Sequence, residues 1–356
     1  MKETAGDVKF HRALRSISPG TPLREGLEHV LRAKTGALIV VSDLPAVMEL
    51  VDGGFAIECE YSPAHLYELA KMDGAIVLSQ DGKKIRYANV HLVPNSSIPS
   101  AETGTRHRTA ERVAKQTGEL VIAISQRRNL ITIWQGSNRY TLRDTAAILS
   151  KANQALQTLD KYKKVLNQSL VNLTALEFED LVTLNEVAGV LQHAIKVLRI
   201  FREIERYILE LGADGRLISM QLEELMGNID DSLLVIRDYC ITSDQKTADL
   251  IREQITALHE ELPEPMAICR LLGFGSHIST LDLPVVPRGY RVLKKIVRIP
   301  MPVIENLVQS FRTLHRISNT TISELDDVEG IGEVRARAIK DGLKRIREQA
   351  LLDRYI

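Results

Sequence analysis

The sequence DGAIVLSQDGKKIRYA, residues 73–88, places two short apolar runs on either side of a tight-turn signal. The runs Ala75–Ser79 and Ile85–Ala88 contain β-branched and aromatic side chains, which favour strands. Asp81-Gly82 between them is a residue pair that two-residue hairpin turns prefer. We therefore expect a β-hairpin here, with Asp73 just before its first strand.

Similar runs and helical segments surround this hairpin. The expected strands are Ala37–Val41, Leu120–Ser125 and Leu130–Trp134, and the expected helices are Ala64–Lys71 and Thr109–Gln116. Strands that alternate with helices predict a mixed sheet flanked by helices. Residues 1–145 are therefore expected to form an α/β domain.

Residues 146–284 have a different pattern, because apolar side chains recur there every three or four positions. The repeat runs from Leu149 to Leu170 and resumes from Val187 to Phe201, and prolines are absent from Ser100 to Leu262. This spacing predicts long antiparallel helices that form a spine, with breaks near Thr174 and at Gly212–Gly215.

Residues 285–356 predict a compact, basic, all-α domain. Three short helices are expected, followed by a basic helix from Val334 to about Gln349. The short helices are Tyr290–Val297, Val303–Phe311 and Ile322–Asp326.

The composition is that of a globular chain of two or three domains, with 356 residues, 44% hydrophobic and 26% charged. Cys59, Cys240 and Cys269 lack metal-ligand spacing, so a disulfide scaffold and a zinc ribbon are not expected. Apolar runs fall far short of the roughly 18 residues of a membrane span. The polar N-terminus resembles no signal peptide, so we expect a cytoplasmic protein.

A formal net charge of zero conceals three parts of different charge. Residues 1–145 carry a net +3, residues 146–284 a net −8 and residues 285–356 a net +5. Basic segments at both ends are suited to an anionic partner at each end. Chance variation of charge between domains is the alternative explanation.

The stretch Gly330-Ile331-Gly332 lies between a short helix and a basic helix that contains Arg335. Two glycines let the backbone turn tightly and bring its N–H groups close to an anion, which the next helix N-terminus also favours. The pattern resembles the helix-hairpin-helix motif that grips DNA phosphates. A dinucleotide fingerprint is excluded because no strand precedes Gly330, whereas a purely structural hairpin is an open alternative.

A second, weaker hairpin precedes it at Val286–Arg291. Pro287 stands where the motif would have its first glycine. Arg288 and Arg291 are therefore further candidates for DNA contact, although this copy could be structural.

The N-terminal domain lacks the Walker A, HExxH and GxSxG signatures, but two other stretches are suited to nucleotide chemistry. Asp73-Gly74-Ala75 supplies a hard oxygen ligand for a divalent ion. The stretch 103–109, Thr-Gly-Thr-Arg-His-Arg-Thr, offers hydroxyls, guanidiniums and an imidazole just before a helix. Taken separately, Asp-Gly is also a common turn and Arg-His-Arg a common surface run.

Together, the two stretches match the signature pair of the diadenylate cyclase domain. With the terminal Gly-Ile-Gly hairpin, essentially the whole chain resembles the bacterial DNA-binding diadenylate cyclases. The resemblance implies condensation of two ATP into cyclic di-AMP and two pyrophosphates at a face-to-face dimer, within an octamer joined through the spine. It also implies that branched, Holliday-junction-like DNA binds without sequence preference and suppresses synthesis, in a nucleoid-associated protein that signals DNA damage.

The resemblance also assigns roles to individual residues. Asp73 would hold Mg²⁺ or Mn²⁺, Gly74 would let the backbone approach the nucleotide, and Leu92 would line the adenine pocket. Thr105 to Thr109 would cradle the phosphates. The other expected roles concern charged and polar side chains: Arg106 and Arg108 as phosphate clamps, His107 as a metal ligand or hydrogen-bond donor, and Ser125, Arg127 and Arg128 at the β- and γ-phosphates.

Two other classes of function are compatible with parts of this pattern. The first is a DNA-repair or structural protein that binds nucleotide without turnover. The second is a phosphodiesterase or nuclease that uses Asp73 and His107, although such enzymes usually need more carboxylates or histidines to hold two metals.

Overall fold

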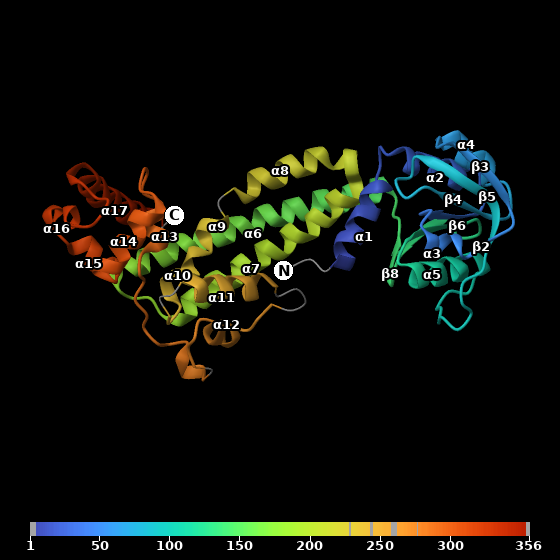
Figure 1. Ribbon diagram of the computed structural model, residues 1–356. Coiled ribbons are helices and arrows are strands. Elements are labelled where there is room, and N and C mark those ends of the chain that lie inside the picture. The colour runs from blue at the N-terminus through green and yellow to red at the C-terminus, as the bar shows by residue number, and fades with distance from the viewer. Residues whose placement is uncertain (1–4, 228, 243–244, 258–261, 276, 354–356) are drawn as a thin grey trace. The chain divides into compact units, whose positions relative to one another are not determined.

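The computed structural model describes residues 5–227, 229–242, 245–257, 262–275 and 277–353. The chain divides into two compact units. Residues 5–153 with 205–219 form the N-terminal unit, and residues 154–204 with 220–353 form the C-terminal unit. The ribbon in Figure 1 follows the chain through both.

The N-terminal unit contains a mixed sheet, which has eight strands within the described residues. The strand order is β2-β5-β4-β1-β6-β7-β8, with β3 also paired to β5. Strands β1 and β4 run parallel, and the other pairs are antiparallel. The bounds are β1 Ala37–Val41, β2 Val51–Asp52, β3 Phe55–Glu60, β4 Ala75–Leu78, β5 Lys84–Leu92, β6 Leu120–Ser125, β7 Leu130–Gln135 and β8 Asn138–Thr141.

Helices cover both faces of this sheet, so the central strands are buried on both sides (Figure 1). On one face, Ile39 of β1 belongs to a core cluster with Leu27 and Leu66. On the other face, Val40 belongs to a cluster with Val113. The first face carries α1 Ala5–Ser16, α2 Pro22–Arg32 and α4 Pro63–Leu69, and the second carries α3 Pro45–Met48 and α5 Thr105–Thr117. The predicted α/β domain is confirmed.

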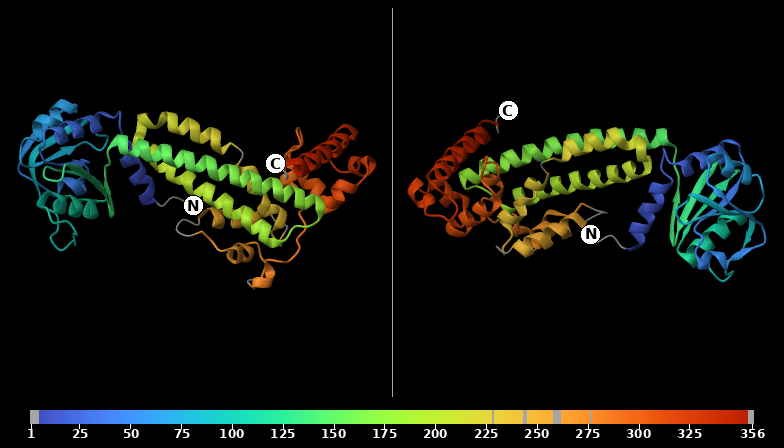
Figure 2. Two further views of the ribbon diagram at one scale, coloured as in Figure 1. Left: turned by 180° about the vertical axis from the view of Figure 1, so that it is seen from behind. Right: turned by 45° about the horizontal axis from the view of Figure 1, so that its top comes forward.

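Two long helices, α6 Thr145–Glu179 and α7 Leu184–Leu211, dominate the predicted spine. They lie side by side and antiparallel in the views of Figure 1 and Figure 2. Shorter elements follow: the 3₁₀ turn Gly212–Gly215, α8 Arg216–Met226, α9 Ile229–Ser232, α10 Leu234–Tyr239, α11 Gln245–Ala257, α12 Pro265–Leu271 and the 3₁₀ turn Ile278–Thr280.

Of the two predicted helix breaks, one is confirmed and one is wrong. The chain leaves the α-helical conformation at Gly212–Gly215 as expected. Helix α6, however, continues through Thr174, because the threonine hydroxyl donates to the Leu170 carbonyl 2.7 Å away and stays satisfied inside the helix. The helix ends instead before Asp180, whose φ of 57° lies in the left-handed region.

The C-terminal helices share a hydrophobic core of their own, with Ile304, Leu307 and Ile339 at its centre. Phe178 of α6 and Leu234 of α10 pack against this core. The C-terminal helices and this part of the spine therefore belong to one compact unit. The helices are α13 Tyr290–Lys294, α14 Met301–Phe311, α15 Leu314–Asn319, α16 Ile322–Asp326 and α17 Glu333–Asp353.

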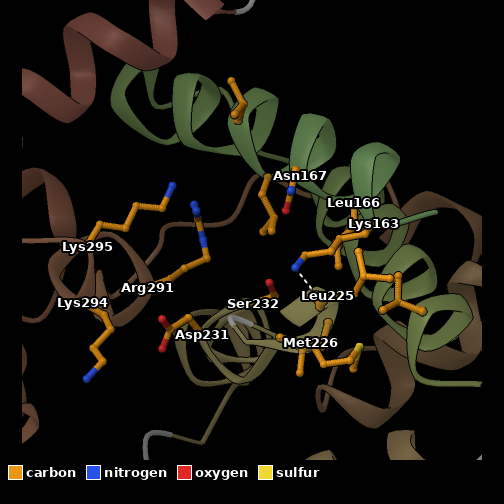
Figure 3. Close-up of a pocket in the computed structure, with 14 residues that line it drawn as sticks. Lys163, Leu166, Asn167, Leu225, Met226, Asp231, Ser232, Arg291, Lys294 and Lys295 are labelled. Atoms are coloured by element: carbon orange, nitrogen blue, oxygen red, sulfur yellow. Dashed lines mark hydrogen bonds between the residues drawn. The ribbon is translucent and has the colours of Figure 1, made fainter. Parts of the chain in front are cut away.

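A cavity of about 320 Å³ lies beside α13, against α6 and α8 in the same unit (Figure 3). No helix in the described part of the chain combines the length and apolar character that crossing a membrane would require.

Candidate functional site

Helix α5 begins earlier than the sequence indicated. Gly104 is its N-cap, with φ −83° and ψ 142°, and the Arg108 amide already donates to the Gly104 carbonyl 2.9 Å away. Thr105 to Thr109 therefore form the first turns of the helix rather than a loop before it. Within the described residues, no side chain caps this first turn. Its amide groups and the positive end of the helix dipole thus favour an anion.

Asp73 and Arg106 lie together although 33 residues separate them in the sequence. The Arg106 Nη2 atom donates to Asp73 Oδ1 at 2.7 Å, and the Asp73 side chain is 98% exposed. The Arg106 guanidinium lies over Gly36, where a Cβ atom would come within 2.5 Å of Nη1. The two predicted motifs therefore meet at one surface of the N-terminal unit.

Gly74 is required by the packing of strand β4 on strand β5. Its amide donates to Asn89 Oδ1 at 3.1 Å, and a Cβ atom at this position would lie 2.4 Å from the Asn89 carbonyl carbon. Asn89 has a φ of 53°, and the pairing of β4 with β5 shifts between Ala75 and Val77. This bulge brings the β5 backbone directly against the Asp73-Gly74 turn.

His107 points to the sheet rather than to open solvent. Its ring meets Trp134 edge to face, with centroids 5.5 Å apart and an interplanar angle of 84°. Partial burial lowers the His107 pKa below its usual value, the Glu102 carboxylate opposes that shift, and the nearby guanidinium of Arg128 supports it. The imidazole is therefore neutral near pH 7.

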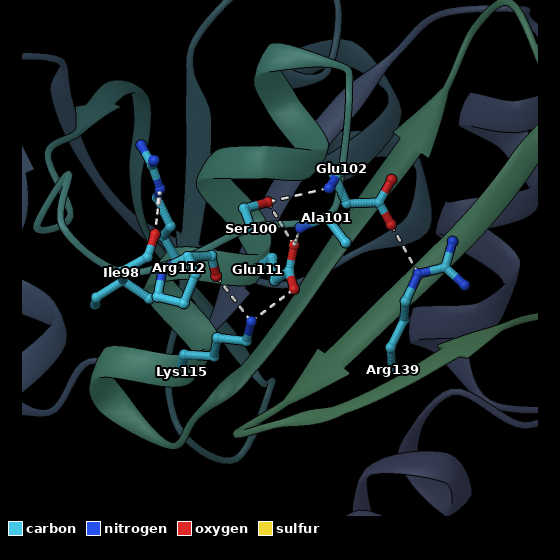
Figure 4. A network of polar contacts seen from close by, with 9 residues as sticks. Ile98, Ser100, Ala101, Glu102, Glu111, Arg112, Lys115 and Arg139 are labelled. Carbon is cyan, nitrogen blue, oxygen red and sulfur yellow. Dashed lines mark hydrogen bonds and ion pairs between the residues drawn. The ribbon is translucent and has the colours of Figure 1, made fainter.

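A polar network holds the segment before Gly104 onto α5 (Figure 4). Glu111 accepts from the Ser100 hydroxyl at 2.5 Å, from the Ala101 amide at 3.1 Å and from Lys115 Nζ at 2.8 Å. Burial tends to raise the Glu111 pKa, but these donors lower it overall. Arg139 adds a second tie, since its Nε donates to Glu102 at 2.7 Å. The segment before α5 is thus tied both to α5, through Glu111, and to β8, through Arg139.

The predicted phosphate contacts of the β6–β7 turn occupy an exposed position. Ser125 ends β6 and is half-buried, and its hydroxyl accepts from the Arg128 amide at 3.2 Å. Arg127 and Arg128 are exposed in the turn, which Asn129 closes with a φ of 52°. No contact among the described residues links these side chains to Asp73 or Arg106.

Leu92 lies at the end of β5, but its side chain is buried with Val47 and Leu50 in the core beneath α3. The side chain thus packs inside the protein. Leu92 pairs with Val51 of β2.

Sequence reasoning missed several residues of this site. Gly36, Asn89 and Trp134 each contact a motif residue, and Glu102 and Glu111 fix the segment that leads into α5. Of these, Glu111 carried a detectable signal, because a buried acidic position on α5 with Lys115 four residues later forms a common helical ion pair.

The second candidate site, the Gly330-Ile331-Gly332 turn, is exposed at both glycines, whereas Ile331 is buried in the core. Gly330 has a φ of 84°, which favours glycine, while a Cβ atom on Gly332 would meet nothing within 4 Å. Arg335 is exposed on α17, and its Nη1 donates to the Gly330 carbonyl at 2.6 Å. The turn thus presents backbone and a guanidinium on the same surface.

In the first hairpin, Val286–Arg291, the backbone amides already have an acceptor within the protein. The Asp238 carboxylate of α10 accepts from the amides of Gly289, Tyr290 and Arg291 at 2.8, 2.6 and 3.1 Å. Burial, and then the charge of Glu177, raise the Asp238 pKa to about 7.

The two arginines of this hairpin are also engaged. The Arg291 side chain is 2% exposed and pairs with buried Glu177 of α6. Arg288 donates to the carbonyls of Arg237 and Ile241 at 2.8 and 3.1 Å. Both were DNA-contact candidates, but in the structure they join α13 to the spine, and Arg291 is almost completely buried.

Two family models match successive segments of the chain. Residues 24–139 match the family described as DisA bacterial checkpoint controller nucleotide-binding, and residues 142–281 match the one described as DisA bacterial checkpoint controller linker region.

Full-length relatives extend this agreement. The DNA integrity scanning protein DisA of Carboxydothermus hydrogenoformans is 61% identical over 345 residues, which cover 96% of this chain and 98% of that protein. The proteins of the same name from Acetivibrio thermocellus and Symbiobacterium thermophilum are each 56% identical, over 98% of this chain and 97% and 98% of their own length. Identity at this level over nearly the whole chain shows that the protein belongs to the DNA integrity scanning protein DisA family.

Proposed function

We propose that the protein is a diadenylate cyclase that condenses two ATP molecules into cyclic di-AMP and two pyrophosphates. The observation that carries this proposal is the meeting of exposed Asp73 with Arg106 at the uncapped start of α5, in a domain of a nucleotide-binding family. Each 3′-hydroxyl oxygen forms a bond to the α-phosphorus of the other ATP. The bond from that phosphorus to pyrophosphate breaks, and the hydroxyl proton is released.

Phosphate binding falls to the start of α5. Its first-turn amides and the helix dipole provide fixed positive potential, to which the exposed part of Arg106 and the Arg108 guanidinium add charge. Arg127 and Arg128 are exposed on the β6–β7 turn and are proposed to reach the terminal phosphates. Such preorganised donors stabilise the negative charge that develops at phosphorus in the transition state.

Asp73 fits a role as the protein ligand of a divalent ion that arrives with the nucleotide. Mg²⁺ commonly binds one or two carboxylates together with substrate phosphates and water. One Asp73 oxygen faces Arg106 and the other faces solvent, and the described residues contain no cluster of three or more His, Cys, Asp or Glu side chains. When bound, the ion would lower the pKa of the 3′-hydroxyl and neutralise phosphate charge.

The exposure of Asp73 supports catalysis between two copies of the domain. A side chain that is 98% exposed has no wall of its own chain around it. A second domain that faces it would supply the other nucleotide and exclude water. The face-to-face dimer, and an octamer built from such pairs, are therefore part of the proposal.

The proposed test is incubation of the purified protein with ATP and Mg²⁺ or Mn²⁺, with identification of products by mass. We expect cyclic di-AMP and two pyrophosphates per cycle. Nucleotide that binds but does not turn over would favour a DNA-repair or structural protein, and hydrolysis of a phosphodiester without cyclic product would favour a phosphodiesterase.

Asp73→Asn sharpens this test. The substitution should lower cyclic di-AMP synthesis at least ~100-fold, because an amide is a much poorer ligand for a hard cation. Stability should hardly change, because an exposed ion pair contributes only about 0–1 kcal/mol. Asp52→Asn, at another exposed carboxylate, on β2, is the matched control and should retain activity. Near-normal synthesis by the Asp73 variant would contradict the metal role.

We further propose that the Gly330-Ile331-Gly332 turn binds DNA phosphates and regulates synthesis. Its support is the open space at Gly332, the neighbouring guanidinium of Arg335 and the net +5 of residues 285–356. Contact through backbone amides and a few basic side chains carries no base information. We therefore expect binding that depends on DNA shape, with branched DNA preferred.

A further inference from the structure

The cavity beside α13 has the composition of a ligand site. Its apolar wall comes from α6 and α8, with Leu166, Leu170, Leu225 and Met226 among the lining residues. Its volume of about 320 Å³ lies at the lower end of the range of small-molecule sites. All lining residues belong to the C-terminal unit, and none belongs to the proposed nucleotide site.

Positive charge dominates the polar part of the lining. Lys163, Arg291, Lys294 and Lys295 face a single acidic residue, Asp231, among the described lining residues. The Lys163 ammonium donates to the Leu225 carbonyl (Figure 3). Figure 3 also shows Lys295 and Arg291 extending in the same direction, whereas Lys294 points away from them. Two cationic groups therefore converge next to an apolar wall.

Arg291 holds a buried donor that the protein itself leaves unused. Its Nη1 donates to the Thr174 hydroxyl at 2.9 Å and its Nη2 to Glu177. Its Nε has no partner among the described residues, although the side chain is 2% exposed. A buried N–H group without an acceptor is costly, and native structures rarely tolerate one without a reason.

The electrostatic environment of Lys295 agrees with an anion site. Although much of its side chain is solvent-exposed, burial around the ammonium and then the positive charge of Arg291 lower the Lys295 pKa to about 8, and the buried Glu177 carboxylate partly opposes this shift. An anion placed between these two groups would reverse that effect, because an opposite charge nearby favours the protonated lysine.

We propose that this cavity binds a small amphipathic anion, with its charged group at Arg291 Nε and Lys295 and its apolar body against α6 and α8. A phosphate monoester and a carboxylate both have this chemistry. A bare inorganic ion would leave the apolar wall unfilled, and an uncharged ring would leave the Arg291 donor unpaired. The ligand would touch both the spine helices and α13, and would stabilise their association.

Titration calorimetry on the full-length protein tests the proposal with four probes. 1-Naphthyl phosphate and 1-naphthoate carry both features, whereas inorganic phosphate and 1-naphthalenemethanol carry one each. We expect at least one of the first two to bind saturably with one site per chain, and the last two to bind at least ~10-fold more weakly. The stronger of the first two identifies the charged group. Absence of saturable binding by both would overturn the proposal.

A pair of neighbouring lysines locates the binding site. Lys295→Gln should weaken binding of the preferred probe at least ~5-fold, because a charge-assisted hydrogen bond is lost. Lys294→Gln removes the same charge one residue away and should change affinity less than ~2-fold. Equal weakening by both variants would show a diffuse charge effect and overturn the proposal.

A third variant separates this cavity from the nucleotide site. Arg108→Ala should leave the probe's affinity unchanged, because the residue belongs to the other unit. Loss of binding in Arg108→Ala with full affinity in Lys295→Gln would place the probe at the nucleotide site and overturn the proposal. That outcome would not touch the proposed cyclase activity, which is measured with ATP alone.

Discussion

The position of the Arg106 side chain depends on Gly36, which has no Cβ atom. Its guanidinium lies over Gly36, the residue just before β1, and from there it reaches Asp73 at 2.7 Å. Arginine presents its donors in a rigid fork, so a small displacement changes which oxygens it can contact. The spacing of the two motifs therefore depends on the small size of a third residue.

Gly36→Ala tests this dependence. The new Cβ atom would lie 2.5 Å from Arg106 Nη1, and the flexible arginine would move aside at little cost in stability. We expect kcat/KM for cyclic di-AMP synthesis to fall about tenfold or more, since a displaced charged donor costs roughly 1.5–3 kcal/mol. Thermal unfolding should change little.

Gly189→Ala, in the interior of α7, is the control for this prediction. A Cβ atom there meets nothing within 4 Å, so the variant should keep full activity and gain up to ~1 kcal/mol of stability. If Gly36→Ala is as active as the parent, the placement of Arg106 does not depend on this glycine.

The residues that could be predicted from sequence are those with a chemical signature. Asp73 and Arg106 were assigned to one site from their motifs, and they do meet. Arg291 was misplaced because a basic residue beside a Pro-Arg-Gly turn looks like a phosphate contact. Its actual partner, Glu177, lies 114 residues earlier, and local sequence contains no information about a contact of that range.

At the scale of elements, the buried strands were predicted best. Strands β1 and β6 and helix α16 begin and end at the expected residues. Continuous β-branched runs that are buried on both faces give a strong local signal. Strand β3 was missed because most of its side chains are exposed and its pairing with β5 is irregular.

Helix α2 was also missed, although its signal was present. Thr21 caps it by accepting from the Arg24 amide, and Pro22 occupies its first turn. Both are typical N-terminal signals. The opposite error occurred near Thr174, where the apolar repeat pauses after Leu170 and a break was predicted that the helix does not have there.

The contact between α10 and α13 yields an element-scale prediction. Asp238→Ala would leave the amides of Gly289, Tyr290 and Arg291 without their acceptor. We expect the C-terminal unit to lose about 2–4 kcal/mol of stability toward urea near pH 5.5, since each unsatisfied buried group costs about 1–3 kcal/mol and relaxation recovers part. Asp231→Ala, at an exposed carboxylate on α9, should lose less than ~0.5 kcal/mol.

The pH dependence of this loss has a definite sign. The Asp238 pKa is about 7 in the folded protein and is ordinarily near 3.8, so the folded state holds the proton more tightly. Its contribution is therefore fully present below about pH 3.8, is lost progressively as pH rises through about 7, and is absent above that. The stability difference between the parent and Asp238→Ala should be smaller at pH 8.5 than at pH 5.5. A difference that grows with pH would show that the ionised carboxylate is the stabilising form.

At the scale of the whole molecule, charge and burial together leave one of the two hairpins as the candidate for the proposed DNA contact. The sequence suggested two copies in a basic segment. In the structure, the first copy is joined to the spine through Asp238, Arg288 and Arg291, and the second presents exposed Gly330 and Gly332. A ligand at α13 and DNA at the second hairpin would therefore act on the same compact unit.

Gly332→Leu tests whether the second hairpin contacts DNA. A Cβ atom at this position meets nothing within 4 Å, so the fold should tolerate the change, whereas Gly330 needs its positive φ and makes a poorer test. The leucine should keep phosphate away from the backbone, and we expect affinity for four-way junction DNA to fall about tenfold in fluorescence anisotropy. Synthesis without DNA should be unchanged, and suppression by junction DNA should weaken in parallel.

Arg335→Gln supplies the complementary measurement. It removes a positive charge, whereas Gly332→Leu blocks the close approach of phosphate to the backbone. The logarithmic dependence of affinity on salt should become shallower by about one unit for Arg335→Gln and stay the same for Gly332→Leu. Two duplexes of different sequence should respond alike to both variants, since phosphate contacts carry no base information. If Gly332→Leu binds junction DNA as tightly as the parent, the turn serves only to connect α16 to α17, and the basic surface of α17 becomes the site to examine.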